Sequence, residues 1–122
     1  MKFMLLTYMD ENAWSKLSPA EQEREMVHCW PHVEKLRAEQ KLLGGGALQP
    51  TSTATTIRYR EGKRLLIDGP FAETREQLGG YTLIEARDLD EAIALASGFL
   101  GTSGLESIEV RPLLDMDVPV SG

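Results

Sequence analysis

An acidic residue followed by a rigid turn is the part of this sequence best suited to chemistry. The segment 68–71 reads Asp-Gly-Pro-Phe. Gly frees the backbone where Pro fixes it, so Asp68 and Phe71 can be held at defined angles at a strand end. On the rim of a cavity, the Asp68 carboxylate can act as a base or as a polar anchor for a ligand. Alternatively it caps the turn by accepting hydrogen bonds from nearby backbone amides. The two roles are compatible, and the sequence leaves both open.

Two histidines offer a second chemical pattern. His28 and His32 are four residues apart and share a face if they lie on one continuous helix. This spacing suits a pair of metal ligands or an acid–base pair. However, the chain has only these two histidines and no HExxH pattern, and Pro31 lies between them. Exposed helix histidines are the simpler interpretation. We expect no metal and no organic cofactor, and we keep both histidines as candidate partners of Asp68.

Two charged residues are candidates for contacting a ligand. Glu73 follows the Asp-Gly-Pro-Phe segment closely enough to point into the same cavity, although a solvated charge is the simpler interpretation. Arg111 lies in an otherwise apolar strand, where a buried guanidinium requires a carboxylate such as Asp68 or Glu85.

Aromatic residues supply the remaining candidates. Phe71 and Tyr81, together with Trp14 and Trp30, are core or interface residues in the simplest interpretation. As the lining of a pocket they would instead suit a small aromatic or planar ligand. Cys29 lies within an apolar helix stripe, which favours a buried, inert thiol over a nucleophile.

The elements that position these side chains follow from periodicity and capping signals. Residues 2–9 predict a strand that is apolar on both faces. Ser18 and Glu21 have the spacing of a capping box, so a helix is expected from residue 19 to a stop at Gly44–Gly46. Pro31 predicts either a kink or the start of a second helix. The expected buried stripe of this segment is Met26, Cys29, Trp30, Val33 and Leu36.

The second half of the chain is predicted to be rich in strands. Residues 53–60 and 63–68 form a hairpin, and strands follow at 80–86 and 107–114. Between them Asp88 caps a helix whose expected buried face includes Leu89, Ile93, Ala96 and Leu100. The order β-α-β-β-β-α-β indicates an α+β fold, a ferredoxin-like antiparallel sheet with two helices on one face and an added hairpin strand. We expect a single domain over 1–114 and a loose tail over 115–122.

Composition limits the classes of partner. The chain has 122 residues and a net charge of −6, with no clustered basic surface, so neither nucleic acid nor an anionic membrane is expected as a partner. A single cysteine excludes an internal disulfide and fits a reducing compartment. No targeting signal is recognised at the N-terminus. A cytoplasmic protein is expected.

Several motifs in a fixed order resemble the DGPF group of YCII-related proteins. They include the 68–71 segment, Gly44–Gly46, Gly79-Gly80-Tyr81 and Glu109-Val110-Arg111-Pro112. The resemblance covers almost the whole chain and implies a dimeric α+β barrel. It also implies a helix histidine that pairs with a pocket aspartate, although the equivalent place here falls nearer Cys29. Independently, strands that are apolar on both faces need a second cover, and a homodimer is expected.

Besides a stable dimer in which the 68–71 segment only maintains the fold, two classes of function follow from these features. In the first, the protein binds a small polar or aromatic metabolite, and Asp68 catalyses a cofactor-free proton transfer or elimination, possible partners being His28 or His32. In the second, implied by the resemblance, it is a non-catalytic ligand-binding or regulatory module associated with extracytoplasmic-function sigma factor signalling. Whether the protein is an enzyme stays open at the level of sequence, because no complete catalytic constellation is visible.

Overall fold

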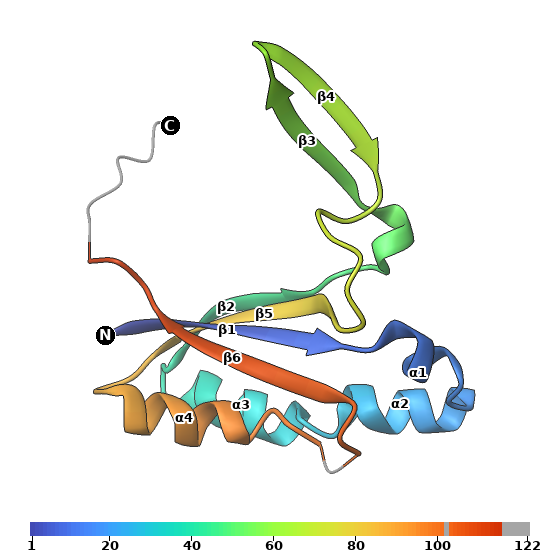
Figure 1. Cartoon of the computed structure of the whole chain (residues 1–122). Helices are drawn as coiled ribbons and strands as arrows, with labels where there is room; N and C mark the ends of the chain where they lie inside the picture. Colours follow the sequence, from blue (N-terminus) through green and yellow to red (C-terminus); the bar gives the residue numbers. More distant parts are fainter. Residues whose placement is uncertain (102, 116–122) are drawn as a thin grey trace.

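A four-stranded antiparallel sheet with helices on one face forms the body of the protein (Figure 1). The structure is a computed structural model that describes residues 1–101 and 103–115. The sheet order is β2-β5-β1-β6, and each neighbouring pair is antiparallel. This is the ferredoxin-like arrangement, with a hairpin inserted between β2 and β5. The strands are β1 (Lys2–Met9), β2 (Leu42–Ala47), β3 (Thr55–Arg60), β4 (Lys63–Asp68), β5 (Gln77–Glu85) and β6 (Glu106–Pro112); the helices are α1 (Glu11–Ser15), α2 (Pro19–Val27), α3 (Trp30–Ala38) and α4 (Leu89–Ser97), with a 3-10 turn η1 (Thr51–Thr53).

The α+β fold class is therefore confirmed, and so are several local signals. Ser18 forms the capping box with Glu21, and Asp88 accepts a hydrogen bond from the backbone amide of Glu91 at the start of α4. Pro31 lies in the first turn of α3, where a missing N–H costs little. It thus marks a second helix rather than a kink.

The glycine triplet was expected to end a helix, and this prediction was wrong. Gly44, Gly45 and Gly46 lie in β2 and pair with β5. A Cβ added to Gly45 would lie 2.6 Å from the Tyr81 carbonyl oxygen, so a side chain is excluded where the two strands approach. Strand pairing explains the glycines here, whereas helix termination does not.

The inserted hairpin is present as predicted, but β3 and β4 form a two-stranded sheet of their own. It projects from the side of the main sheet opposite the helices (Figure 1). Its apolar side chains are exposed, with Ile57 at 60% and Tyr59 at 73%. A lone two-stranded hairpin is marginally stable in water, so this element needs further contacts.

The core lies between α4 and one half of the sheet. Phe3 and Ile84 are opposite each other on β1 and β5 and are almost completely buried. Ala92 and Ala96 face them from α4, and their small side chains let the helix approach the sheet closely. The buried face of α4 therefore differs from the expected one: Ala92 and Ala96 are buried, whereas Ile93 is 48% exposed.

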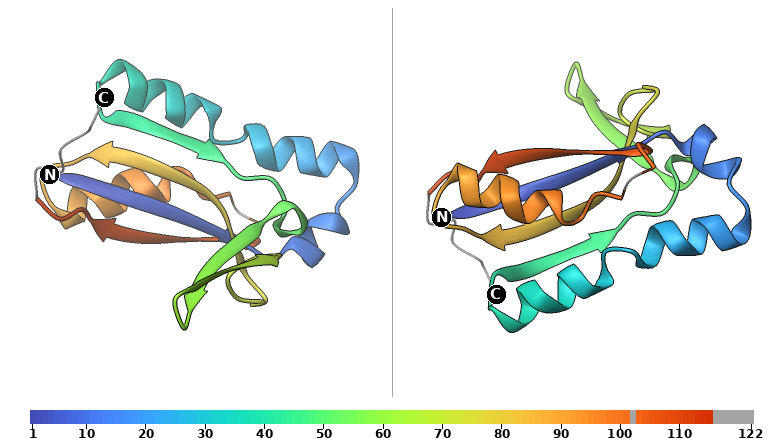
Figure 2. Two further views of the ribbon diagram at one scale, coloured as in Figure 1. Left: turned by 90° about the horizontal axis from the view of Figure 1, so that it is seen from above. Right: turned by 90° about the horizontal axis from the view of Figure 1, so that it is seen from below.

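The helices divide the sheet between them. Figure 2 shows α4 beneath the β1 and β6 side, whereas α2 and α3 run along the edge formed by β2. The other face of the main sheet, which includes the paired residues Leu6 and Tyr81, is not covered by any described helix (Figure 1). No helix in the described ranges is long and apolar enough to cross a membrane. Of the predicted tail over 115–122, residues 116–122 lie outside the described residues.

Candidate active site

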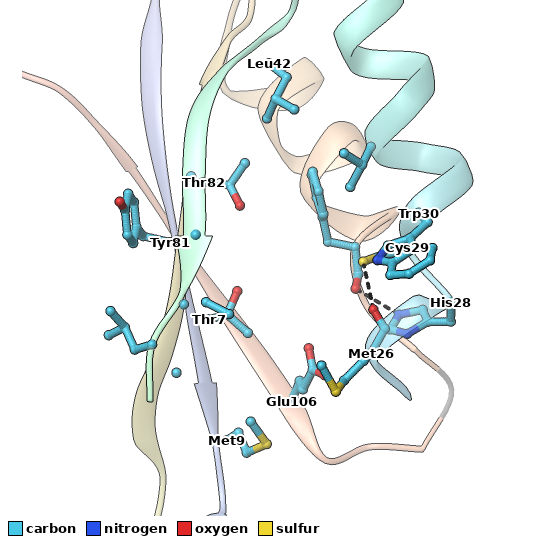
Figure 3. A pocket seen from close by; sticks show the side chains of 18 of the residues that line it. Thr7, Met9, Met26, His28, Cys29, Trp30, Leu42, Tyr81, Thr82 and Glu106 are labelled. Carbon is cyan, nitrogen blue, oxygen red and sulfur yellow. Dashed lines mark hydrogen bonds between the residues drawn. The ribbon is translucent and has the colours of Figure 1, made fainter. Parts of the chain in front are cut away.

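A cavity of about 750 Å³ lies between α2, α3 and the neighbouring part of the sheet (Figure 3). Its helix wall contains most of the stripe that sequence periodicity assigned to the core. Met26 and Trp30 are 61% and 60% exposed, and only Leu36 of that stripe is buried. The lining consists of Thr7, Met9, Trp14, Glu25, Met26, His28, Cys29, Trp30, Val33, Arg37, residues 42–48, residues 79–82, Phe99 and Glu106.

The cavity exists because side-chain size falls along one face of the sheet. At the core end, Phe3 is paired with Ile84. Side chains two residues apart share a face of a strand, so Thr7 and Thr82 face the same layer. Thr7 is paired with Gly80, which has no side chain. The space that large residues fill next to α4 is left open next to α2 and α3.

Glu106 is the most chemically distinctive residue of this cavity. It begins β6, is paired with Met9 and is partly buried. No hydrogen bond or ion pair to its carboxylate occurs among the described residues. Burial raises the pKa of Glu106 above its ordinary value of 4.5; nearby Glu25 raises it further, and His28 opposes the shift. A carboxyl with a raised pKa in a cavity is suited to accept and return protons.

His28 lies beside this carboxyl at the C-terminal end of α2. Its Nε2 is 3.0 Å from the carbonyl oxygen of Phe99, and its Nδ1 faces the carbonyl oxygen of Glu25. Carbonyl oxygens only accept, so a ring that donates from both nitrogens satisfies both contacts. Cys29 lines the same wall, and burial raises the pKa of its thiol, with a smaller contribution from Glu106. A raised pKa lowers the thiolate fraction, which does not favour Cys29 as a nucleophile.

His32 has a packing role instead. Its Nε2 is 2.7 Å from the carbonyl oxygen of Leu95, and its ring meets that of Phe99 edge-on at 4.8 Å. The ring also lies directly against Gly98. His32 ties α3 to α4 and is not among the residues that line the cavity. Because α2 and α3 are separate helices, the four-residue spacing of the two histidines does not build one site.

The hairpin end that carries Asp68 lies away from this cavity. Asp68 is exposed, and within the described residues its carboxylate has no hydrogen-bond partner. The turn is closed instead by Gly69, whose N–H donates to the carbonyl oxygen of Ala54 over 2.8 Å and whose carbonyl oxygen accepts from Thr56. Neither predicted role of Asp68 is therefore visible in a single chain.

Of the other predicted ligand contacts, only Tyr81 is among the residues that line the cavity. Phe71 is 77% exposed and stacks under Arg58, with 5.6 Å from the guanidinium to the ring centre, and Glu73 is also exposed. Arg111 was expected to be buried beside Asp68 or Glu85, and this was wrong: it is exposed and lies 3.9 Å from Glu109. Tyr81 contributes to the rim of the cavity, but its ring points to the opposite side of the sheet (Figure 3).

His28, a candidate from the sequence, lines this cavity, whereas Glu106 was not among the predicted site residues. The signal lay in strand alternation. Ile108 and Val110 pack against the core, and the same alternation places Glu106 on that face. A charged residue on the apolar face of a strand is unusual and identifies a candidate site residue. No group of three or more potential metal ligands occurs among the described residues.

Comparisons with known proteins show which family this chain is related to. The model of the YCII-related domain matches residues 1–116. An uncharacterized protein of Rhizobium meliloti (strain 1021) is 40% identical over 114 residues, which cover 93% of this chain and 92% of that protein. Among solved structures, the chain is similar to a 5-chloro-2-hydroxyhydroquinone dehydrochlorinase from Burkholderia phenoliruptrix in complex with 2,5-dihydroxybenzoquinone. The TM-score is 0.49 and the identity 16%, over 93% of this chain and 94% of that chain. Assignment to the DGPF group stays a prediction, whereas the family match and the Rhizobium relative show that this chain belongs to the YCII-related domain family.

Proposed function

We propose that the protein binds a small, largely apolar molecule in the cavity and exchanges a proton with it through Glu106. The observation that carries this proposal is a partly buried carboxyl on the cavity wall whose pKa is raised by burial. Structural carboxylates normally accept hydrogen bonds or form ion pairs that lower their pKa. Glu106 has no hydrogen bond or ion pair among the described residues, and the charge of nearby His28 opposes the effect of burial on its pKa. This favours a working acid or base.

The chemistry needs only the residues present. Glu106 as carboxylate accepts a proton from the ligand, and as carboxylic acid it returns the proton to another atom of the same molecule, so no electrons are gained or lost. A positively charged His28 ring would stabilise the carboxylate form electrostatically, the direction in which His28 affects the pKa of Glu106. Trp14 and Trp30 line the cavity and offer aromatic surface to a bound molecule. Asp68 remains a candidate for a site that includes a second chain.

The test combines ligand binding with proton exchange. A thermal-shift screen of small aromatic compounds compares the wild type with Glu106→Gln and with Glu109→Gln. Glu109 is the matched control, because it lies on the same strand but faces the other side of the sheet. A ligand at a hundred times its dissociation constant stabilises a protein by about 2.7 kcal/mol, which a melting curve resolves easily.

For any compound that binds, the exchange of its acidic C–H hydrogens for deuterium in D₂O is followed by NMR. Wild type and Glu109→Gln should accelerate exchange, and Glu106→Gln should not. Compounds that bind all three proteins equally, or exchange that survives in Glu106→Gln, would show that Glu106 has no such role. Asp68→Asn is included in the same screen, and a loss of exchange confined to that variant would restore Asp68 as the catalytic candidate.

A second candidate function rests on the projecting hairpin. Ile57, Tyr59 and Leu66 are each at least 60% exposed there, which suits a surface that contacts another protein. A non-catalytic regulatory module associated with an extracytoplasmic-function sigma factor would use such a surface. Co-elution with a purified sigma factor, lost in Tyr59→Ser but retained in Glu106→Gln, would support it. Failure of the wild type to co-elute would exclude that partner.

A further inference from the structure

We propose that the cavity takes an organic cation, a small amine with an apolar or aromatic body. This inference rests on the proposed function, because it names the ligand class of the same cavity. It follows from the balance of charge in the lining and from the two tryptophans that line the same cavity.

The lining carries two carboxyl groups whose charges are not fully balanced. Glu25 and Glu106 both line the cavity, and the charge of Glu25 disfavours ionisation of Glu106. The Arg37 guanidinium is already paired with Glu34 at 2.6 Å. The two ring nitrogens of His28 are directed at carbonyl oxygens. Within the described part of the chain, no other cationic side chain lines the cavity, so a bound cation would supply what the site lacks.

Aromatic side chains provide the second half of the recognition. Trp14 and Trp30 both line the cavity, and Trp30 is 60% exposed. The faces of indole rings attract cations more strongly than those of other aromatic side chains. Met26, Val33 and Leu42 offer apolar surface for the carbon skeleton of the ligand. An amine can therefore place its charge near carboxylates and indoles while burying its body among apolar groups.

The same charges select against anions. A carboxylate ligand would meet Glu25 and would need Glu106 to stay protonated, whereas a cation favours the ionised form of Glu106. Binding of a cation should thus release a proton from Glu106. Since the pKa of Glu106 is raised in the free protein, affinity for a cation should rise with pH through that pKa and fall in more acidic solution.

The experiment uses three probes with nearly the same skeleton: 2-phenylethylamine, 2-phenylethanol and phenylacetate. Each is titrated into the full chain while tryptophan fluorescence is recorded, because both tryptophans of the protein line the cavity. Titrations are run at pH 8 and pH 5 on the wild type, Glu106→Gln, Glu25→Gln and the control Glu109→Gln. At pH 8 the amine should bind the wild type about tenfold more tightly than the alcohol, a difference of about 1.4 kcal/mol. Phenylacetate should bind most weakly.

Each outcome has a distinct meaning. The preference for the amine should shrink at pH 5 and in both cavity variants, and it should persist in Glu109→Gln. If the alcohol or phenylacetate binds as well as the amine and binding still depends on Glu106, the cation proposal is wrong and the proposed function survives. If no probe binds the wild type, the cation proposal is overturned for this ligand class, and the wider compound screen then decides the proposed function separately. The pH comparison on the wild type keeps the test valid even if a variant folds poorly.

Discussion

Replacing Gly98 with alanine tests the packing role of His32 directly. Gly98 follows α4 in right-handed helical backbone, with φ −69°, so alanine suits the backbone there. However, the added Cβ would lie 2.4 Å from the His32 ring, well inside contact distance. The ring must move, and it would lose its hydrogen bond to Leu95 and its edge-on contact with Phe99.

The magnitude follows from these contacts. A partly buried hydrogen bond contributes about 1 kcal/mol and an aromatic edge contact about the same. Replacing glycine by alanine in compatible backbone returns about 0.4–1 kcal/mol through the unfolded state. Gly98→Ala should therefore lower the free energy of unfolding by about 1 kcal/mol, which lowers the melting temperature by about 4 °C in a domain of this size.

The assay is a double-mutant cycle measured by urea unfolding. Gly98→Ala is compared in the wild type and in a His32→Ala background, where the added methyl group meets no ring and should be neutral or stabilising. Gly44→Ala is the matched control, because nothing lies within 4 Å of its Cβ position. Equal destabilisation by Gly98→Ala in both backgrounds would refute a packing role for His32.

Three further predictions use other groups. Folding raises the pKa of Glu106, so its contribution to the free energy of unfolding is fully present below pH 4.5 and is lost as pH rises through the pKa of the folded state. Urea unfolding should therefore find Glu106→Gln more stable than the wild type at pH 8, with no difference near pH 4. Light scattering should give twice 13.6 kDa for the wild type and for Ile93→Glu on the helix side, but a monomer for Leu6→Glu on the face without helices. A monomeric wild type at micromolar concentration would contradict the homodimer. Cys29 should react with iodoacetamide more slowly at pH 8 than a free thiol, because burial raises its pKa; reaction at the free-thiol rate would show that the site is open.

Local signals were predictable because they depend on residues close together in the chain. The capping box at Ser18, the helix start at Asp88 and the first strand all follow from short-range sterics and hydrogen bonding. Gly44–Gly46 was misjudged because its role depends on β5, more than thirty residues away. Local propensity cannot detect that partner.

The helix stripe shows a different limit of periodicity. Met26, Cys29 and Trp30 were correctly placed on one apolar face, but periodicity states only that a face turns inward, not that something fills the space opposite. Across the cavity the sheet offers Thr7 and Gly80, which are too small to reach the helix. A stripe assigned to the core therefore became the wall of a cavity.

Asp68 and Glu106 differ as candidates because their surroundings arise in different ways. Asp68 attracted attention because its neighbours in sequence are unusual, yet those neighbours shape a turn on an exposed hairpin. Glu106 has ordinary neighbours in sequence, and its importance comes from facing Glu25 and His28 across segments far apart in the chain. A carboxyl becomes reactive through the charges and the burial around it, which are set by the tertiary fold. Glu106 is therefore the better candidate for proton transfer, because it lies on the apolar face of β6 where the cavity leaves that face uncovered.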